Sequence, residues 1–227
     1  MTAPVQQVGR NRSQVMTGAP DVKYSGGFWI GDPVYDPEKF PKSAKEDGKE
    51  AAARFGALSA GFITREGVSE SSDRSTDKIL DWNLDVIDVV TTDFSTTLTV
   101  TFAETMNAEV LRFIYGDENV RVDEEEEGEV YIRKTSDDLP TKSIMFDLKG
   151  KNGARGRGFA AEATVQTVGE IAYVKDGLIQ YQTTIDVLND VTGAFLHTWF
   201  SKGGVTRASR VEANTADGST AVGTGGQ

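Results

Sequence analysis

Apolar and polar residues alternate regularly between residues 93 and 103. The apolar face carries Phe94, Leu98, Val100 and Phe102, with Thr96 beside them, and the opposite face carries Ser95, Thr97, Thr99 and Thr101. A period of two places successive side chains on opposite faces of a β-strand. One apolar and one polar face are typical of an antiparallel strand that lies between a core and water. The segment is therefore predicted to be a half-buried strand.

The segment before this strand is also strand-like. Residues 82–90 are rich in Val and Ile, and Thr91-Thr92-Asp93 has the composition of a turn. Together these features predict a β-hairpin between residues 82–90 and 93–103.

The period changes to that of a helix over residues 104–115. Met106, Val110 and Phe113 recur at i, i+4 and i+7, and Leu111 and Ile114 widen the same stripe. The segment also holds residues suited to helix ends, namely Thr105 or Asn107 as caps, Glu109 and Arg112 as an i, i+3 pair, and Gly116 as a left-handed terminator. A weaker helix is predicted over 44–55, where Ser43 and Glu46 have capping-box spacing but Gly48 interrupts.

The second half of the chain reads mainly as short strands. Strand-like segments separated by turn residues cover 130–134, 143–148, 159–168, 170–175 and 194–200. Asp176-Gly177 is a typical two-residue turn, in which both residues need positive φ, and it predicts a second hairpin between 171–175 and 178–188. Several short strands and one good helix predict a mainly β fold, an antiparallel β-sandwich or rolled barrel with one flanking α-helix.

Composition divides the chain into one body and two arms. A chain of 227 residues with 38% hydrophobic content can bury one sizeable core. Residues 1–27 and 201–227 offer little that packs, so they are predicted to be an N-terminal and a flexible C-terminal arm around a domain at 28–200. The formal net charge of −11 is uneven, with +2 on the first arm, +1 on the second and −14 on the body. A body this acidic repels phosphates, so sequence-independent DNA binding is not expected.

Candidate chemistry is sparse. The chain has no Cys, which excludes disulfides, thiolate metal sites and a thiol nucleophile. His197, the single histidine, shares a strand face with Phe195 and Trp199, and no nucleophile motif accompanies it. We therefore expect a structural histidine, no catalytic residue, no metal site, no cofactor and no enzymatic activity. No apolar stretch approaches the ~18 residues of a membrane span, and no secretory signal is evident, so a soluble protein without membrane partners is expected.

Two loops of opposite charge stand out. Acidic residues crowd residues 123–129, but without the spacing of a calcium loop, and residues 149–158 carry four cations among Gly and Ala. The acidic run can equally be read as an ordinary solvated loop, and the basic run as the flexible tip of a hairpin. The two loops would have complementary charge if copies of the chain met head to tail. The basic arms could likewise bind the acidic bodies of neighbouring copies. The predicted inter-subunit contacts are therefore Lys149, Lys151, Arg155, Arg157, Asp123, Glu124, Glu125, Glu126, Glu127, Arg10 and Arg12.

Three stretches resemble the major tail tube family of siphophages. The first is Gly18-Ala19-Pro20-Asp21-Val22 followed by Gly26-Gly27-Phe28-Trp29-Ile30. The second is Gly61-Phe62-Ile63-Thr64-Arg65-Glu66-Gly67-Val68, which is similar to the family's Gly-Tyr-Ile-Ser/Thr-Glu-Asp-Gly-Val motif, with Arg65-Glu66 in place of Glu-Asp. The third runs from Ile79 to Gly116 and holds a strand around Trp82, a Thr-rich strand and the helix that ends in Tyr115-Gly116. The resemblance covers residues 18–116.

The resemblance implies a structural protein of the bacteriophage virion. Its fold would assemble into hexameric rings, which stack into a hollow tube that conducts the genome into the host. Partners would be further copies of the chain, a tape measure protein and other tail proteins, with genome DNA passing through without specific binding. Assembly would take place in the cytoplasm of the host bacterium and the product would be the phage tail.

A sheet that lines such a channel must be polar on one side and apolar on the other. Two strands have this pattern, and their polar residues are the candidate lumen-facing set of Ser95, Thr97, Thr99, Thr101, Gln180, Gln182, Thr184 and Asp186. An ordinary solvent-exposed face has the same pattern. The long connections 31–60 and 117–129 are predicted to be contact loops between subunits. Alternative functions are a related ring-forming protein, such as a tail terminator or secretion-tube homologue, and a monomeric β-sandwich binding or decoration module.

Overall fold

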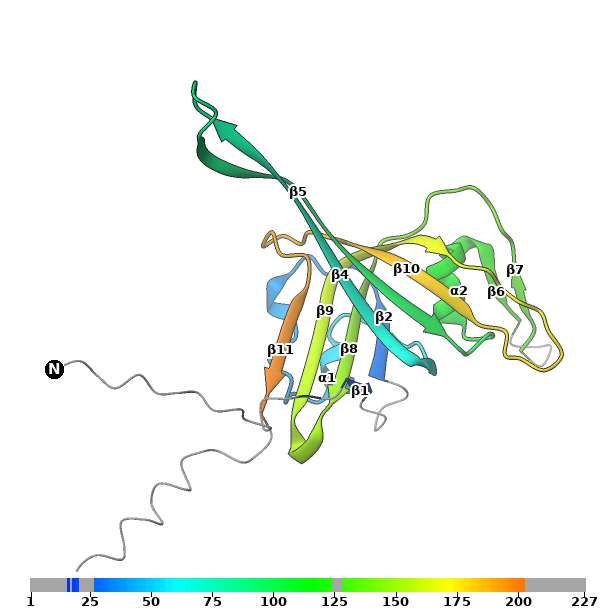
Figure 1. The fold of residues 1–227 in the computed structure, drawn as a ribbon. Helices are drawn as coiled ribbons and strands as arrows, with labels where there is room; N and C mark the ends of the chain where they lie inside the picture. The colour runs from blue at the N-terminus through cyan, green and yellow to red at the C-terminus, as the bar shows by residue number, and fades with distance from the viewer. Residues whose placement is uncertain (1–15, 17, 21–26, 124–127, 203–227) are drawn as a thin grey trace, which may run out of the picture.

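The computed structural model describes residues 16, 18–20, 27–123 and 128–202. Among these residues, nine antiparallel strands form one large sheet (Figure 1). Its strands are β1 (Ala19–Pro20), β2 (Phe28–Gly31), β3 (Leu58–Ser59), β4 (Ile63–Leu80), β5 (Val86–Phe102), β8 (Lys142–Lys149), β9 (Arg155–Val168), β10 (Tyr181–Leu188) and β11 (His197–Ser201). They run in the order β3-β2-β8-β9-β10-β5-β4, with β1 added to β8 and β11 added to β9.

Smaller elements complete the fold. A two-stranded sheet joins β6 (Val120–Val122) and β7 (Val130–Ile132), and the helices are α1 (Gly48–Ala53) and α2 (Ala108–Tyr115). The described residues also form the short 3-10 helices η3 (Pro37–Lys39), η4 (Asp117–Asn119) and η5 (Lys151–Gly153). The mainly antiparallel β fold with a flanking helix is confirmed, and α1 is a second helix beside it.

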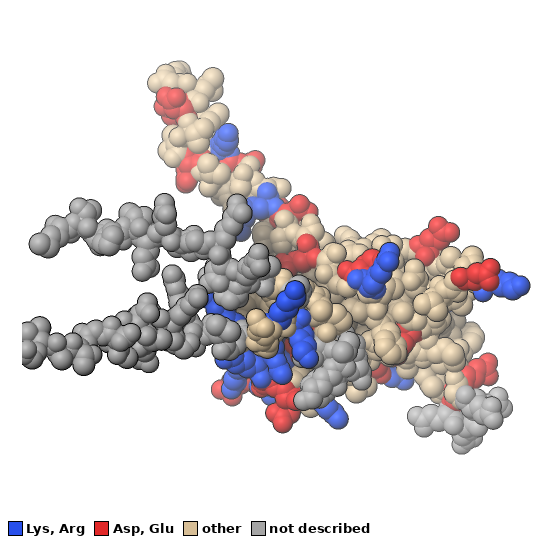
Figure 2. Space-filling view, turned by 60° about the horizontal axis from the view of Figure 1, so that its bottom comes forward, with Lys and Arg blue, Asp and Glu red and all other residues tan. Residues whose placement is uncertain are grey.

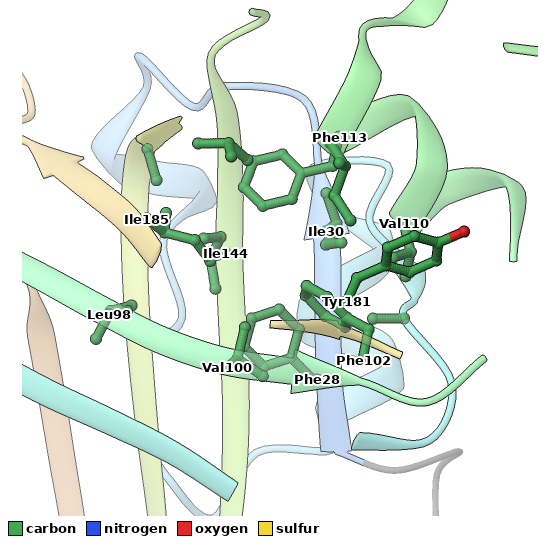
Figure 3. Packing of buried hydrophobic residues seen from close by; sticks show 14 of the residues in the cluster. Phe28, Ile30, Leu98, Val100, Phe102, Val110, Phe113, Ile144, Tyr181 and Ile185 are labelled. Carbon is green, nitrogen blue, oxygen red and sulfur yellow. The ribbon is translucent and has the colours of Figure 1, made fainter. Parts of the chain in front are cut away.

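The main core lies between the inner face of the sheet and α2 (Figure 3). Phe28 and Phe102 meet edge to face with ring centroids 5.5 Å apart, and Phe113 of α2 is fully buried near them. The alternation predicted for β5 is confirmed, because its inner residues from Leu98 to Phe102 are buried while the residues between them are half-exposed. Burying such aromatic side chains on one face supplies most of the free energy that holds β5 and β10 against α2.

Strand β2, residues 143–147 of β8 and residues 156–161 of β9 are buried on both faces. A second cluster packs Trp29, Met145 and Phe159 against Phe40 and Phe55 of the segment between β2 and β3. Sequence reasoning treated residues 31–60 as an inter-subunit contact loop, and that prediction is wrong for the buried part of the segment. Its apolar residues form a cover over the sheet, so they are already buried within one subunit.

Helix α2 ends and begins as expected, with one difference. Asn107 is the N-cap, and its side-chain oxygen accepts hydrogen bonds from the N–H groups of Glu109 and Val110. Glu109 pairs with Arg112 at 2.8 Å, and Gly116 ends the helix with a φ of 94°. Met106 lies before the helix and is exposed, so it does not belong to the apolar stripe.

Helix α1 is shorter than the predicted 44–55 segment. Asp47 caps it through the N–H groups of Lys49 and Glu50, while Ser43 and Glu46 accept hydrogen bonds from Lys45 and Lys42 and form no capping box. Gly48 is the first helical residue and does not interrupt the helix. A Cβ at Gly48 would collide with the Asp147 carboxylate, so the glycine allows α1 to approach the sheet closely.

The first predicted hairpin is wrong in its pairing. Strand β5 runs through residues 91–93 without a turn, and its partner is β4, which was not predicted as a strand. The connection between them is the turn at residues 81–85, where Trp82 lies in the turn and not in a strand. The outer part of β4 is polar and exposed on both faces, so no apolar alternation marks it in the sequence.

The second predicted hairpin is also wrong. Residues 169–180 contain no strand, and β10 pairs with β9 on one side and β5 on the other. Gly177 does not have the positive φ that the predicted two-residue turn requires. Residues 171–175 include the exposed side chains Tyr173 and Val174, so the segment has no buried face that would stabilise its pairing with another strand.

The predicted arms lie mostly outside the described residues. Strand β1, inside the predicted N-terminal arm, pairs with β8 through Ala19 opposite Lys149. At the other end, β11 extends to Ser201. Division of the chain into a domain at 28–200 and two arms stays a prediction.

Candidate functional site: assembly surfaces

The outer face of β4, β5, β10 and β9 is a continuous polar surface, here called the polar face. One row across the four strands joins Ser71, Thr97, Asp186 and Thr164, and the next row joins Ser69, Thr99, Thr184 and Thr167. The opposite face of β5 and β10 carries the buried residues Leu98, Val100, Ile185 and Val187. On β5 and β10 the polar face therefore arises because the core covers these strands on one side only.

The structure brings the two candidate lumen-facing sets together. Thr97, Thr99 and Thr101 of β5 lie directly opposite Asp186, Thr184 and Gln182 of β10. Ser95 continues the face toward Asp73 of β4, and Gln180 lies just before β10. Sequence reasoning placed the two strands separately, whereas the register makes them neighbours on one surface.

Charge on the polar face is low and acidic. Its charged members among the paired rows are Asp73, Asp93, Asp186 and Glu162, and none of the residues in these rows is Lys or Arg. At the lower end of the face, Arg65 helps line a depression with Gln180 and Gln182, and its Nε lies 3.1 Å from Glu66 Oε1. A phosphate that approached the rows would meet hydroxyls, amides and carboxylates but no unpaired cation.

The β4–β5 hairpin projects far beyond the body (Figure 1). Its tip, residues 79–90, exposes a dense set of apolar side chains, with Trp82 99% exposed. The other exposed members are Ile79, Leu80, Leu84, Val86, Ile87, Val89 and Val90. Apolar side chains gathered in this way on an exposed surface are typical of a contact surface. Sequence reasoning missed this site, because it assigned the same Val and Ile residues to a strand of a predicted hairpin and did not predict their exposure.

The turn at the tip is well ordered by its own hydrogen bonds. Asp81 Oδ1 accepts from the N–H groups of Asn83 and Asp85, each at 2.8 Å. Leu84 has a φ of 68°, which is unfavourable for a residue with a branched side chain. The turn thus holds Trp82 and Leu84 outward in a defined conformation.

The predicted basic contacts separate into two environments. Lys149 and Lys151 are exposed and Arg155 is half-exposed, all at the β8–β9 turn. Arg157 is only 1% exposed. Its guanidinium binds both Asp147 carboxylate oxygens, at 2.6 and 2.8 Å, and donates to the carbonyls of Ser43 and Glu46. Arg157 therefore joins the sheet to the α1 segment and is not available to a neighbouring subunit.

The predicted acidic and arm contacts lie largely outside the described residues. Asp123 is exposed at the end of β6, and its N–H donates to the Glu129 carbonyl at 2.9 Å. Glu124, Glu125, Glu126, Glu127, Arg10 and Arg12 all fall outside the described ranges. Their role as contacts stays a prediction.

His197 has a structural partner. Its Nε2 lies 2.6 Å from Asp190 Oδ2, and its ring stacks on Trp199 with centroids 5.8 Å apart. Burial raises the pKa of the Asp190 carboxyl, but hydrogen bonds from the Thr192 side chain, His197 and the backbone N–H groups of Thr192 and Ala194 outweigh burial and hold the pKa below its ordinary value. The pair fixes the turn between β10 and β11.

Asp190→Asn is expected to lower the free energy of unfolding at pH 7 by about 1–3 kcal/mol, because buried donors lose a charged acceptor. A lowered folded-state pKa stabilises the fold above the unfolded pKa of about 3.9, and this contribution is lost as the pH falls through the folded value. The difference between the variant and the wild type should therefore shrink below about pH 4, as measured by urea unfolding between pH 3 and pH 7. Asp137→Asn, at an exposed position, is the control and should show no such trend.

No cluster of three or more His, Asp or Glu side chains suited to a metal ion occurs among the residues described. In the same part of the chain, no helix has the length and apolar content needed to cross a membrane.

Comparison with known proteins gives little similarity. No family model matches the chain, and no curated protein matches it. Several chains of solved structures match, and one of them is similar at 11% identity, covering 80% of this chain and 97% of that chain with a TM-score of 0.33. It belongs to a structure described as a cryo-EM structure of the anti-feeding prophage baseplate, 6-fold symmetrised. A similarity this low supports no functional conclusion.

Proposed function

We propose that this chain is a structural subunit of a bacteriophage tail tube, in which hexameric rings stack into a hollow tube that conducts the genome. The observation that carries the proposal is the polar face, a sheet surface four strands wide that presents hydroxyl, amide and carboxylate groups and no unpaired cation along its rows. A channel for DNA needs a wall that does not bind phosphates. The motif resemblance over residues 18–116 supports the same proposal.

The edge of the sheet supports self-assembly. Strand β4 is the outermost strand, and its second edge pairs with no other strand among the described residues. A long unpaired edge is an aggregation hazard in a monomer, and pairing it with a neighbouring copy removes the hazard. A closed ring of copies does this for every subunit at once.

The protruding hairpin also favours an assembly over a monomeric module. Its apolar tip is too far from the body to pack against the same subunit (Figure 1). A tail terminator or secretion-tube homologue would share these features. A decoration or binding module would need neither the free β4 edge nor the polar face. In a tail tube, the proposed partners are further copies, a tape measure protein and other tail proteins.

Negative-stain microscopy of the purified chain over a range of concentrations tests the proposal. Rings or tubes with a central channel are expected, and their abundance should rise with concentration. A uniform population of small particles at every concentration, confirmed by sedimentation as monomer, would contradict the tube and favour the monomeric module.

A further inference from the structure

The β8–β9 turn carries a basic cluster that no acidic side chain among the described residues neutralises. Lys149 and Arg155 lie directly opposite each other in the ladder, and Ser201, next to Lys202, lies opposite Arg155. Lys151 is at the apex of the turn. None of these four cations forms an ion pair with another described residue. Like charges on directly opposed residues destabilise a sheet, so this arrangement favours binding of an anionic partner.

The surface around this cluster is also apolar. Phe200 of β11 is 70% exposed, and a Cβ at Gly156 would lie 3.2 Å from its ring. Figure 2 shows basic side chains gathered on this end of the body. Lys149, Lys151, Arg155, Lys202 and Phe200 are here called the basic patch.

The tip of the β4–β5 hairpin has the complementary character. Asp81, Asp85 and Asp88 stand among its exposed apolar residues, and residues 77–90 hold one Lys against four Asp, a net charge of −3. None of these aspartates forms an ion pair with another described residue. The tip and the basic patch each combine an exposed aromatic ring with charges of one sign.

The two surfaces lie at opposite ends of the subunit. Figure 1 shows the hairpin tip projecting from one end and the β8–β9 turn at the other. They cannot meet within one copy. A contact between different surfaces of identical copies is heterologous, and repetition of such a contact produces a linear or helical stack.

We propose that the hairpin tip of one subunit docks on the basic patch of a second copy in the adjacent ring, with Trp82 against Phe200 and the tip aspartates against Lys149, Lys151 and Arg155. This contact rests on the proposed tube, and it assigns the partner of the basic loop to the hairpin instead of residues 123–127. The apolar contact supplies affinity, and the charges set orientation and reject the reverse pairing.

Charge exchange tests the contact. Asp85→Lys with Asp88→Lys, and separately Lys149→Glu with Lys151→Glu, should each raise the concentration at which tubes form by roughly tenfold or more, since like charges then face each other. The four substitutions in one chain restore opposite charges and should return tube formation to within about threefold of the wild type. Sedimentation and negative-stain counts of tube length measure both effects. Asp81 is left unchanged because it orders the turn.

Trp82→Ser is a second, uncharged probe. Because the side chain is 99% exposed, the variant should unfold like the wild type yet assemble poorly. Arg121→Glu with Lys175→Glu, at exposed positions elsewhere, makes the same change in net charge as the basic-patch variant and should not alter assembly.

The outcomes separate the two proposals. If the charge-reversed variants form tubes as well as the wild type does, the proposed contact is wrong and the proposed tube is unaffected. If the wild type forms neither rings nor tubes, the proposed function fails and the contact fails with it. Loss of duplex DNA binding in the Lys149→Glu, Lys151→Glu variant, without an effect on tubes, would identify the basic patch as a nucleic-acid site and overturn the contact.

Discussion

Replacing Arg157 by Met is expected to lower the free energy of unfolding by about 3–5 kcal/mol, because it breaks a buried ion pair. The guanidinium is almost fully buried and binds the Asp147 carboxylate through both oxygens. Methionine fills similar space but leaves that carboxylate without its cation and the carbonyls of Ser43 and Glu46 without these donors. Chemical unfolding of the monomer, followed by tryptophan fluorescence, measures the effect.

Two further variants define the cause. Arg155→Met removes a cation two residues away that is half-exposed, and it should change the free energy of unfolding by less than about 0.5 kcal/mol. Asp147→Leu combined with Arg157→Met removes both charges and should recover much of the loss, because an apolar pair often replaces a buried ion pair without penalty. If Arg157→Met unfolds like Arg155→Met, the ion pair does not hold the α1 segment to the sheet.

Arg157 also shows where sequence reasoning about charge fails. Residues 149–158 look like a uniform basic loop in the sequence, and Arg157 is one of four cations in it. The β8–β9 register places Arg157 opposite Asp147, inside the subunit, whereas Arg155 pairs with Lys149 near the turn. Arg157 is buried because β8 lies beside it and the α1 segment covers it. The composition of residues 149–158 gives no information on either contact.

Local patterns were sufficient where one face of an element is buried. The alternation in β5 and the 3.6-residue period in α2 follow directly from contact with the same core, and Asn107, Glu109 and Gly116 act as expected. Alternation does not identify a strand whose two faces are both exposed or both buried. The outer part of β4 is exposed on both faces and β2 is buried on both, so neither shows the alternation of a half-buried strand.

Strand pairing was the other limit. Both hairpins inferred from neighbouring segments were wrong, because β5 pairs with β4 across the turn at residues 81–85 and β10 pairs with β9 across residues 169–180. The polar face could be identified on each strand separately from the Ser, Thr and Gln residues of β5 and β10. Only the register between Thr97 and Asp186 shows that the two strands make one surface.

Lysines placed on the polar face are expected to convert an inert tube into one that retains DNA. Thr97→Lys with Thr184→Lys adds two cations to each subunit on neighbouring strands of the face, where both threonines are half-exposed. If six copies line a channel, the added cations form rings that attract phosphates. Retention of labelled DNA by sedimented tubes should rise at least about tenfold in low salt and fall steeply as the salt concentration increases.

Matched substitutions separate position from charge. Thr97→Gln with Thr184→Gln lengthens the same side chains without charge and should retain no DNA. Ser136→Lys with Asp137→Asn makes an equal change in net charge on an exposed loop away from the polar face, so DNA should bind only to the outside of the tubes and remain accessible to nuclease. Nuclease resistance of the DNA held by the Thr97→Lys, Thr184→Lys tubes would then place the face in the channel. Retention no greater than in the Ser136→Lys, Asp137→Asn tubes would instead mean that the face is an ordinary outer surface, because cations on a channel wall must meet any DNA inside it.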